Sequence, residues 1–252
     1  MEEQWLPAST PYFEQYLHPH LPSLSISEID YLQDLPVMTV GSAANWPPIE
    51  FFADDTFQGV ALDYLNNIKK KLNIRTTQTK SKNWNQNVDR TENGAIQILT
   101  AVMEANDVND ELILTAPYAS FQIVAMTRPN NPPLSGLKDM EGMLIGAVLE
   151  GELKTILEKN YPNLLIKNVS NSLQGSKDLH NEHIDVYIGN HLIIAHDLEQ
   201  LKYKGLKVGL FTDHFLNLKM EVHRDFKQLV PIFNKLFASI SNRENKIFLP
   251  SV

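Results

Sequence analysis

The sequence has no cysteine among its 252 residues. This absence excludes disulfide scaffolds, Cys-ligated zinc, iron–sulfur clusters and thiol nucleophiles. Glycine is also scarce, with 11 residues, and the chain contains neither a Walker-type glycine loop nor the patterns G-x-G-x-x-G and G-x-S-x-G. No motif therefore indicates nucleotide binding or serine hydrolase chemistry.

Basic residues are fewer than acidic ones, 22 against 30, which gives a net charge of −8. Nucleic-acid binding needs a concentrated basic face, and the one lysine triplet, Lys69–Lys71, is interpreted as the solvated end of an amphipathic helix. No apolar run approaches the ~18 residues that span a bilayer. The first ten residues, MEEQWLPAST, also lack the basic and apolar regions of a signal peptide. We therefore expect no nucleic-acid partner for this chain and no membrane-spanning segment within residues 1–252.

Histidines occur in pairs, at His180 and His183 and at His191 and His196. Zinc sites need three or four convergent ligands, and these spacings match no known metal motif. The sequence therefore predicts neither a metal site nor a cofactor.

The order of apolar and polar runs predicts an α/β protein. Residues 1–23 carry four prolines and are interpreted as a leader segment. Ser25 and Glu28 form a capping-box pattern that predicts a short helix. After it, strand-like runs alternate with helix-like runs, an order typical of parallel strands covered by helices. The predicted elements include strands at 37–41, 122–127, 206–211 and 219–223, and helices at 59–72 and 226–240.

Several short motifs resemble, in order, those of the family 3 extracytoplasmic solute-binding proteins. They are Trp46-Pro47-Pro48-Ile49-Glu50-Phe51, Gly59-Val60-Ala61-Leu62-Asp63, Ala116-Pro117-Tyr118, Leu137-Lys138-Asp139-Met140-Glu141-Gly142 and His183-Ile184-Asp185-Val186-Tyr187-Ile188. The resemblance implies a two-lobe Venus flytrap of the periplasmic-binding-protein type II class, with mixed sheets flanked by helices. Lobe 1 is expected at 24–118 plus 215–252 and lobe 2 at 120–210, with hinge crossings near 118–121 and 209–215.

The segment before the first strand, Leu24-Ser25-Ile26-Ser27-Glu28-Ile29-Asp30-Tyr31-Leu32, is similar to the lead-in of the sensor domains of BvgS-like and EvgS-like hybrid histidine kinases. This resemblance implies a periplasmic sensor domain of a transmembrane two-component kinase, which signals by lobe opening and closing, with or without a ligand. Its partner would be a neighbouring flytrap or membrane module. The alternative is a freestanding solute-binding protein that delivers a non-standard solute to an ABC permease. Neither function is enzymatic.

Seven residues are the expected ligand-binding set when the family pattern is carried over position by position. Trp46 and Trp84 offer aromatic faces that can hold a planar or cationic group. The other five positions are Glu104, Tyr118, Gly151, Glu152 and Asn190.

The charged groups that hold an amino acid in this family are missing. Where the resemblance places an arginine that clamps the α-carboxylate, this chain has Val108 and Asn109, and Asn190 stands where an aspartate takes the ammonium. Glu152 replaces a small Ser or Thr after Gly151, and Gln97 replaces a strand aspartate with an expected structural role. A bidentate Arg–carboxylate pair is a strong interaction. We therefore expect weak binding of ordinary amino acids, and either a small polar neutral or cationic ligand or no ligand.

Overall fold

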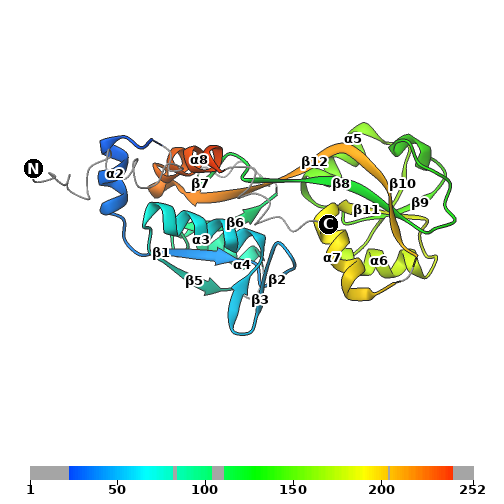
Figure 1. The fold of residues 1–252 in the computed structure, drawn as a ribbon, viewed down its shortest axis with the longest axis horizontal. Coiled ribbons are helices and arrows are strands. Elements are labelled where there is room, and N and C mark those ends of the chain that lie inside the picture. The colour runs from blue at the N-terminus through cyan, green and yellow to red at the C-terminus, as the bar shows by residue number, and fades with distance from the viewer. Residues whose placement is uncertain (1–22, 82–83, 104–110, 204, 241–252) are drawn as a thin grey trace, which may run out of the picture. The chain divides into compact units, whose positions relative to one another are not determined.

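The computed structural model describes residues 23–81, 84–103, 111–203 and 205–240. These residues form two compact units (Figure 1). Lobe 1 holds the described residues of 1–102, 108–118 and 219–251, and lobe 2 holds those of 103–107 and 119–218. The chain thus leaves lobe 1, builds lobe 2 and returns. The hinge positions given by the sequence stay predictions, and the leader lies almost wholly outside the described residues.

The main sheet of lobe 1 has three parallel strands in the order β5-β1-β6. They are β1 (Met38–Ser42), β5 (Thr76–Lys80) and β6 (Ile98–Val102). The long strand β12 (Lys207–His223) pairs antiparallel with β6 and with the short β7 (Leu112–Leu114). A separate antiparallel sheet contains β2 (Asn45–Trp46), β3 (Glu50–Ala53) and β4 (Thr56–Gln58).

Lobe 1 has five helical elements among its described residues. They are α2 (Ile26–Gln33), α3 (Val60–Leu72), α4 (Trp84–Glu92), the 3-10 turn η2 (Arg224–Phe226) and α8 (Leu229–Ser239). Tyr118 packs between two of them, since its ring centroid lies 4.7 Å from that of Tyr64 on α3 and 5.4 Å from that of Phe237 on α8. The apolar stripes of α3 and α8 therefore share one core.

The capping box at the start of α2 is confirmed. Glu28 N donates to Ser25 Oγ at 3.2 Å, and Ser25 N donates to Glu28 Oε2 at 2.7 Å. The same carboxylate binds α8, because Lys235 Nζ lies 2.8 Å from both Glu28 oxygens. Glu28 thus caps its own helix and ties that helix to α8.

Lobe 2 has a mixed sheet in the order β10-β9-β11-β8-β12. Its strands are β8 (Ala119–Thr127), β9 (Leu144–Ala147), β10 (Leu165–Asn168), β11 (Val186–Asn190) and the first part of β12; its helices are η1 (Leu137–Met140), α5 (Gly151–Asn160), α6 (Ser172–His180) and α7 (His191–Leu201). The helix α5 covers one face and α6 and α7 cover the other (Figure 1). Alternate residues of β8 explain this arrangement, since Ile123 packs with Leu157 of α5 and Val124 with Ile194 of α7.

The prediction of two separate strands at 206–211 and 219–223 was wrong. Residues Lys207–His223 form the single strand β12, whose register shifts between Phe211 and Phe215. The polar residues of this bulge stay attached to the sheet, because Thr212 Oγ1 donates to Ile123 O at 2.8 Å. A bulge adds residues without ending the strand.

Tyr187 of β11 fills a space that three glycines leave open. The side chain is 2% exposed. A Cβ atom at Gly175 of α6 would lie 2.3 Å from the Tyr187 ring, and added Cβ atoms at Gly146 and Gly189 would lie 3.6 and 3.2 Å from its side-chain atoms. The helix α6 can pack this close to the sheet only because position 175 has no side chain.

Substitution of this glycine tests the packing. We expect Gly175→Ala to lower the free energy of unfolding by about 1–3 kcal/mol, the usual cost of overpacking, although helix propensity alone favours alanine by about 1 kcal/mol. Chemical denaturation of the 252-residue chain measures the change. Gly136→Ala is the matched control, because its φ is −170° and nothing lies within 4 Å of an added Cβ. Equal stability of the two variants would contradict the prediction.

Candidate ligand-binding faces of the two lobes

The carboxyl ends of β1 and β6 lie at one edge of the lobe 1 sheet, because these strands are parallel. A polar network occupies this edge: Ser42 Oγ lies 2.9 Å from Thr100 Oγ1. Glu50 of β3 joins it, since Ala43 N donates to Glu50 Oε1 at 2.5 Å and Thr100 Oγ1 donates to Oε2. The Glu50 side chain is 0% exposed. Sequence analysis cited Glu50 only as part of a motif and missed this network.

Burial raises the pKa of Glu50 to about 8, and the hydrogen bonds from Thr100, Ala43 and Ser42 offset only part of that increase. The carboxyl is therefore mostly neutral at pH 7. Its bond to Ala43 N fixes the start of the loop that leads to Trp46, and Trp46 is the register partner of Glu50 in the β2–β3 pair. Glu50 thus positions the backbone that carries the first predicted aromatic residue.

Trp46 is half-buried on β2, directly before the cis peptide bond between Pro47 and Pro48. Trp84 is the first residue of α4, but its side chain is outside the described part of the structure. Glu104, Val108 and Asn109 also lie outside the described residues. The structure thus describes the side chain of only one of the two predicted tryptophans, Trp46. The ligand contacts of Trp46, Trp84 and Glu104 stay predictions.

Tyr118 lies in the core of lobe 1 and is 6% exposed. Its hydroxyl donates to Thr100 O at 2.7 Å, and its ring packs between Tyr64 and Phe237. Burial raises its pKa well above the ordinary value. These contacts give Tyr118 a structural role beside the Glu50 network. Its hydroxyl is already bonded to Thr100 O, so the predicted contact of Tyr118 with a ligand stays a prediction.

In lobe 2, the helix α5 begins at the predicted Gly151, whose φ is +57°. Glu150 is the N-cap residue, and its side chain makes no capping hydrogen bond. Glu152 is half-buried in the first turn, where its negative charge suits the helix dipole. The start of α5 therefore carries acidic side chains where the resemblance implies a small hydroxyl residue.

Asn190 ends β11 and caps α7. Its Oδ1 accepts from Leu192 N at 2.9 Å and from Ile193 N at 3.4 Å. The residue is 4% exposed, and its Nδ2 has no hydrogen-bond partner among the described residues. The adjacent His191 ring contacts the ring of Phe211 edge-on, with centroids 5.1 Å apart, and Phe211 is 54% exposed. Sequence analysis considered His191 only as a metal ligand and missed its contact with Phe211, because no local motif links a helix start to a distant strand.

Three further charged or polar residues, Arg128, Asp185 and Gln97, bind the protein itself. Arg128 donates to Leu179 O at 2.8 Å and to Ile184 O at 2.6 Å, and lies 3.3 Å from Asp185 Oδ1. Asp185 Oδ2 also accepts from Leu144 N at 2.9 Å. Gln97 Oε1 accepts from Thr39 N at 2.7 Å, which confirms its structural role. Arg128 is therefore occupied within lobe 2.

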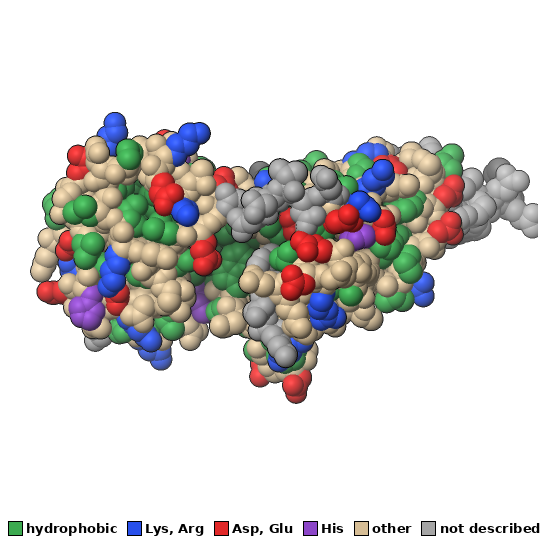
Figure 2. Space-filling model, turned by 180° about the vertical axis from the view of Figure 1, so that it is seen from behind, with side chains coloured by type: hydrophobic (Ala, Val, Ile, Leu, Met, Phe, Trp, Pro, Cys, Tyr) green, Lys and Arg blue, Asp and Glu red, His purple; other side chains and the backbone are tan. Residues whose placement is uncertain are grey.

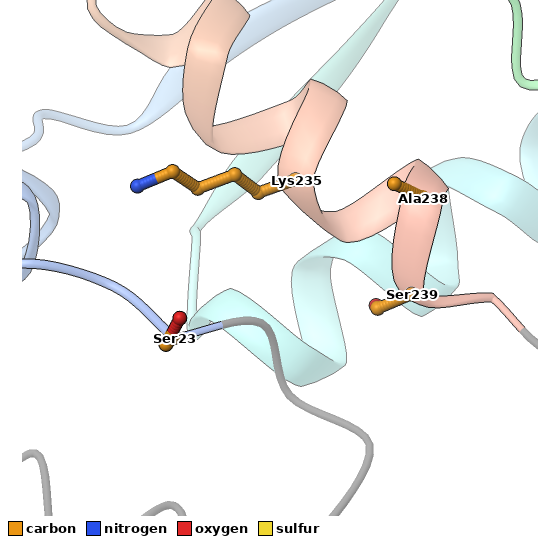
Figure 3. Close-up of a pocket in the computed structure, with 4 residues that line it drawn as sticks. All are labelled: Ser23, Lys235, Ala238 and Ser239. Atoms are coloured by element: carbon orange, nitrogen blue, oxygen red, sulfur yellow. The ribbon is translucent and has the colours of Figure 1, made fainter.

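A pocket of about 370 Å³ lies elsewhere in lobe 1, between the segment before α2 and the helix α8 (Figure 3). It is lined by Ser23, Lys235, Ala238 and Ser239, and none of the predicted ligand residues belongs to it. Lys235 uses its ammonium group for Glu28. Within the described parts of the chain, no three acidic or histidine side chains gather closely enough to hold a metal ion.

Charged side chains of both signs are mixed on the surface of each lobe in Figure 2. That face shows no continuous basic stripe over the described residues. The mixture of signs on that face agrees with a sequence whose net charge is −8.

The family model of the bacterial extracellular solute-binding proteins, family 3, matches residues 38–246. The chain belongs to this family. Its fold is the two-lobe Venus flytrap that the motifs implied. The periplasmic VFT2 domain of BvgS from Bordetella pertussis superposes with a TM-score of 0.76 at 18% identity, over 90% of this chain and 98% of that one. A histidine kinase sensor domain with similarity to periplasmic binding proteins gives 0.66 at 14% identity, over 86% and 94% of the two chains.

Two kinds of curated relative are similar in sequence. A probable histidine-binding protein of Campylobacter jejuni is 28% identical over 143 residues, which are 56% of this chain and 52% of the relative. The virulence sensor protein BvgS of Bordetella bronchiseptica is 23% identical over 173 residues, 68% of this chain and 14% of the relative. The matched segments thus cover about half of the first relative and a small part of the second.

The buried carboxyl of Glu50 predicts a pH dependence of stability. Its folded pKa of about 8 lies above the ordinary 4.5, so its contribution is fully present below pH 4.5 and is lost as pH rises to about 8. The loss is at most several kcal/mol, since each pKa unit is about 1.4 kcal/mol. We expect Glu50→Gln to flatten the fall of the unfolding free energy between pH 5 and 8, as measured by urea denaturation.

A control variant separates this effect from that of a second, partly buried carboxyl. Glu221 of β12 has a pKa raised by burial to about 7, so Glu221→Gln should flatten a narrower window that ends near pH 7. An unchanged slope in Glu50→Gln up to pH 8 would contradict the assignment of the wider window to Glu50.

Proposed function

We propose that this chain is the extracytoplasmic, periplasmic sensor domain of a transmembrane two-component histidine kinase. A change in the relative placement of the two lobes would shift the equilibrium of an attached kinase module. The observation that carries the proposal is the capped lead-in helix α2 before β1, bound to α8 through Glu28 and Lys235. The sequence similarity to BvgS over 68% of this chain supports it.

The position of α2 and α8 suits such a signal. Both helices lie on lobe 1, and α8 is the last described helix of the chain. A neighbouring module attached beyond α8 would be coupled through Lys235 to the segment that enters lobe 1. No described helix is long and apolar enough to cross a membrane.

A second candidate is a freestanding solute-binding protein that delivers a non-standard solute to an ABC permease. The 28% identity to a probable histidine-binding protein favours it. The full reading frame separates the two functions: a membrane segment and kinase modules after Val252 support the sensor, and a lipid-attachment or signal sequence with a stop codon near Val252 supports transport. We propose no catalytic role for the domain in either case.

A kinase fusion tests the sensor function. The chain is joined to the membrane segment and kinase of a BvgS-like protein, and autophosphorylation is measured in membrane vesicles. We expect Trp46→Ala to change kinase output about fivefold or more, the lower range of allosteric coupling, because Trp46 pairs with Glu50 and follows the loop that Glu50 positions. Val37→Ala is the control, since Val37 is an exposed apolar residue of the same lobe, 46% exposed. Equal kinase output from the unmodified fusion, the Trp46→Ala fusion and the Val37→Ala fusion would refute the sensor proposal.

The ligand is proposed to be a small polar molecule, neutral or cationic, or to be absent. The twenty standard amino acids should produce no thermal stabilisation of the chain, because Val108 and Asn109 supply no guanidinium and Asn190 supplies no carboxylate. Thermal denaturation with each amino acid at millimolar concentration measures this. A shift of several degrees with any L-amino acid would show that other residues hold its charged groups.

A further inference from the structure

His223 is the last residue of β12 and lies in lobe 1, at the end of the sheet away from the candidate ligand residues. The preceding Val222 pairs with Ile98, the first residue of β6, whereas the Glu50 network lies at the carboxyl ends of β1 and β6. His223 is 6% exposed, and the η2 turn starts directly after it. The residue therefore joins the strand that serves both lobes to the segment that leads into α8.

The ring of His223 caps η2 through one of its nitrogens. Asp225 N donates to His223 Nδ1 at 3.3 Å. A ring nitrogen that accepts from a backbone N–H carries no proton, so the proton of the neutral imidazole is on Nε2. The cap is followed by two backbone hydrogen bonds, from Lys227 N to Arg224 O at 3.1 Å and from Val230 N to Lys227 O at 3.2 Å. Because Val230 belongs to α8, this series of bonds runs from the end of β12 into that helix.

A carboxylate lies beside each nitrogen of the ring. Asp225 Oδ2 is 3.5 Å from Nδ1, and Glu111 Oε2 is 3.9 Å from Nε2. The Asp225 side chain is 71% exposed, so it has room to turn toward the ring. A protonated imidazole donates from both nitrogens. The two carboxylates can therefore accept from the protonated ring, one on each side.

The other neighbours of the ring add one cation and one further carboxyl. Arg224 Nη1 lies 2.7 Å from Glu111 Oε1, the second oxygen of that carboxylate. Glu221 is two residues before His223 on β12, and it lies on the same face because side chains alternate along a strand. The turn before β6 brings the uncharged Gly94 close, since an added Cβ there would lie 3.8 Å from His223 Nε2. The described charged groups around the ring are thus three acids and one arginine.

Protonation of Nδ1 and capping by Nδ1 exclude each other. A proton on Nδ1 would face the N–H of Asp225, and a donor that loses its acceptor costs free energy. The end of the strand does not depend on the ring, because His223 N donates to Gln97 O at 2.9 Å and Arg224 N donates to Glu111 O at 2.7 Å. A change in the charge of the ring therefore acts on the segment after Arg224 and leaves the sheet in place.

We propose that His223 is a pH-sensitive switch at the junction of β12 and α8. The neutral ring caps η2, and the protonated ring releases Asp225 N and donates to the carboxylates of Asp225 and Glu111. Histidine is the side chain whose charge ordinarily changes between pH 5 and 8. Acidification therefore loosens η2 and the first turn of α8, the helix that Lys235 binds to α2. This inference goes beyond the proposed function, since it needs neither a ligand nor an attached kinase.

Nuclear magnetic resonance of the full 252-residue chain, labelled with nitrogen-15, tests the proposal. The ring signals of His223 should show an unprotonated Nδ1 at pH 8 and protons on both nitrogens at pH 5. Hydrogen exchange of the amides of Asp225, Lys227 and Val230 is measured at both pH values, each relative to an unstructured peptide at the same pH. We expect their protection to fall about fivefold on acidification, the usual effect of one lost side-chain cap.

The decisive variant is His223→Asn. Asparagine is a strong capping residue whose oxygen accepts from a backbone N–H and takes up no proton in this pH range. Its three amides should have the same protection at both pH values. The matched control is Glu221→Gln, which removes the other group of this strand face that titrates near neutral pH, since burial raises the pKa of Glu221 to about 7. This control should retain the fall in protection.

Several outcomes overturn the proposal. A proton on His223 Nδ1 at pH 8 contradicts the cap, and an unprotonated Nδ1 at pH 5 contradicts the switch. Protection of the three amides that does not change while the ring gains its proton shows that the cap does not control η2. These results come from the unmodified chain, so they hold even if His223→Asn fails to fold. A folded His223→Asn chain that keeps the fivefold fall, or a Glu221→Gln chain that loses it, assigns the effect to another group.

Discussion

The antiparallel pairing of β12 is the constraint on which both lobes depend. Its first part pairs with β8 in lobe 2, and its second part pairs with β6 and β7 in lobe 1. Buried backbone groups need hydrogen-bond partners, so neither sheet is complete without this strand. The strand continues through the bulge between Phe211 and Phe215, because Thr212 still binds Ile123 and the pairing with β8 resumes at Phe215.

Polar residues next to strand ends follow a common pattern in both lobes: their side chains make hydrogen bonds to backbone groups of the same lobe. Glu50 gives one oxygen to Ala43 N, and Asn190 gives its only oxygen to α7. Arg128 likewise serves the carbonyl groups of Leu179 and Ile184. What a ligand can meet is therefore decided by the atoms that the fold leaves unused. A family pattern that records only residue types does not show which atoms these are.

Sequence reasoning gave the family, the two-lobe fold and most of the elements, because these follow from local patterns such as the box of Ser25 and Glu28. It failed at β12, where two strands at 206–211 and 219–223 were predicted and the structure has one strand with a bulge. It also missed the roles of Glu50 and Asn190. The burial of Glu50 depends on residues 50 positions away, such as Thr100, and the unpaired Nδ2 of Asn190 depends on three-dimensional packing that no local pattern reports.

The topology also sets the order in which the chain can fold during synthesis. Most of lobe 2 is one insertion, Ala119–Leu218, whose first and last residues are direct register partners. All of its strands exist once residue 218 has been made. Lobe 1 begins earlier but lacks the second part of β12 and α8 until about 20 more residues follow. Because domains generally fold as units while the chain is made, lobe 2 has its full set of strands available before lobe 1 does.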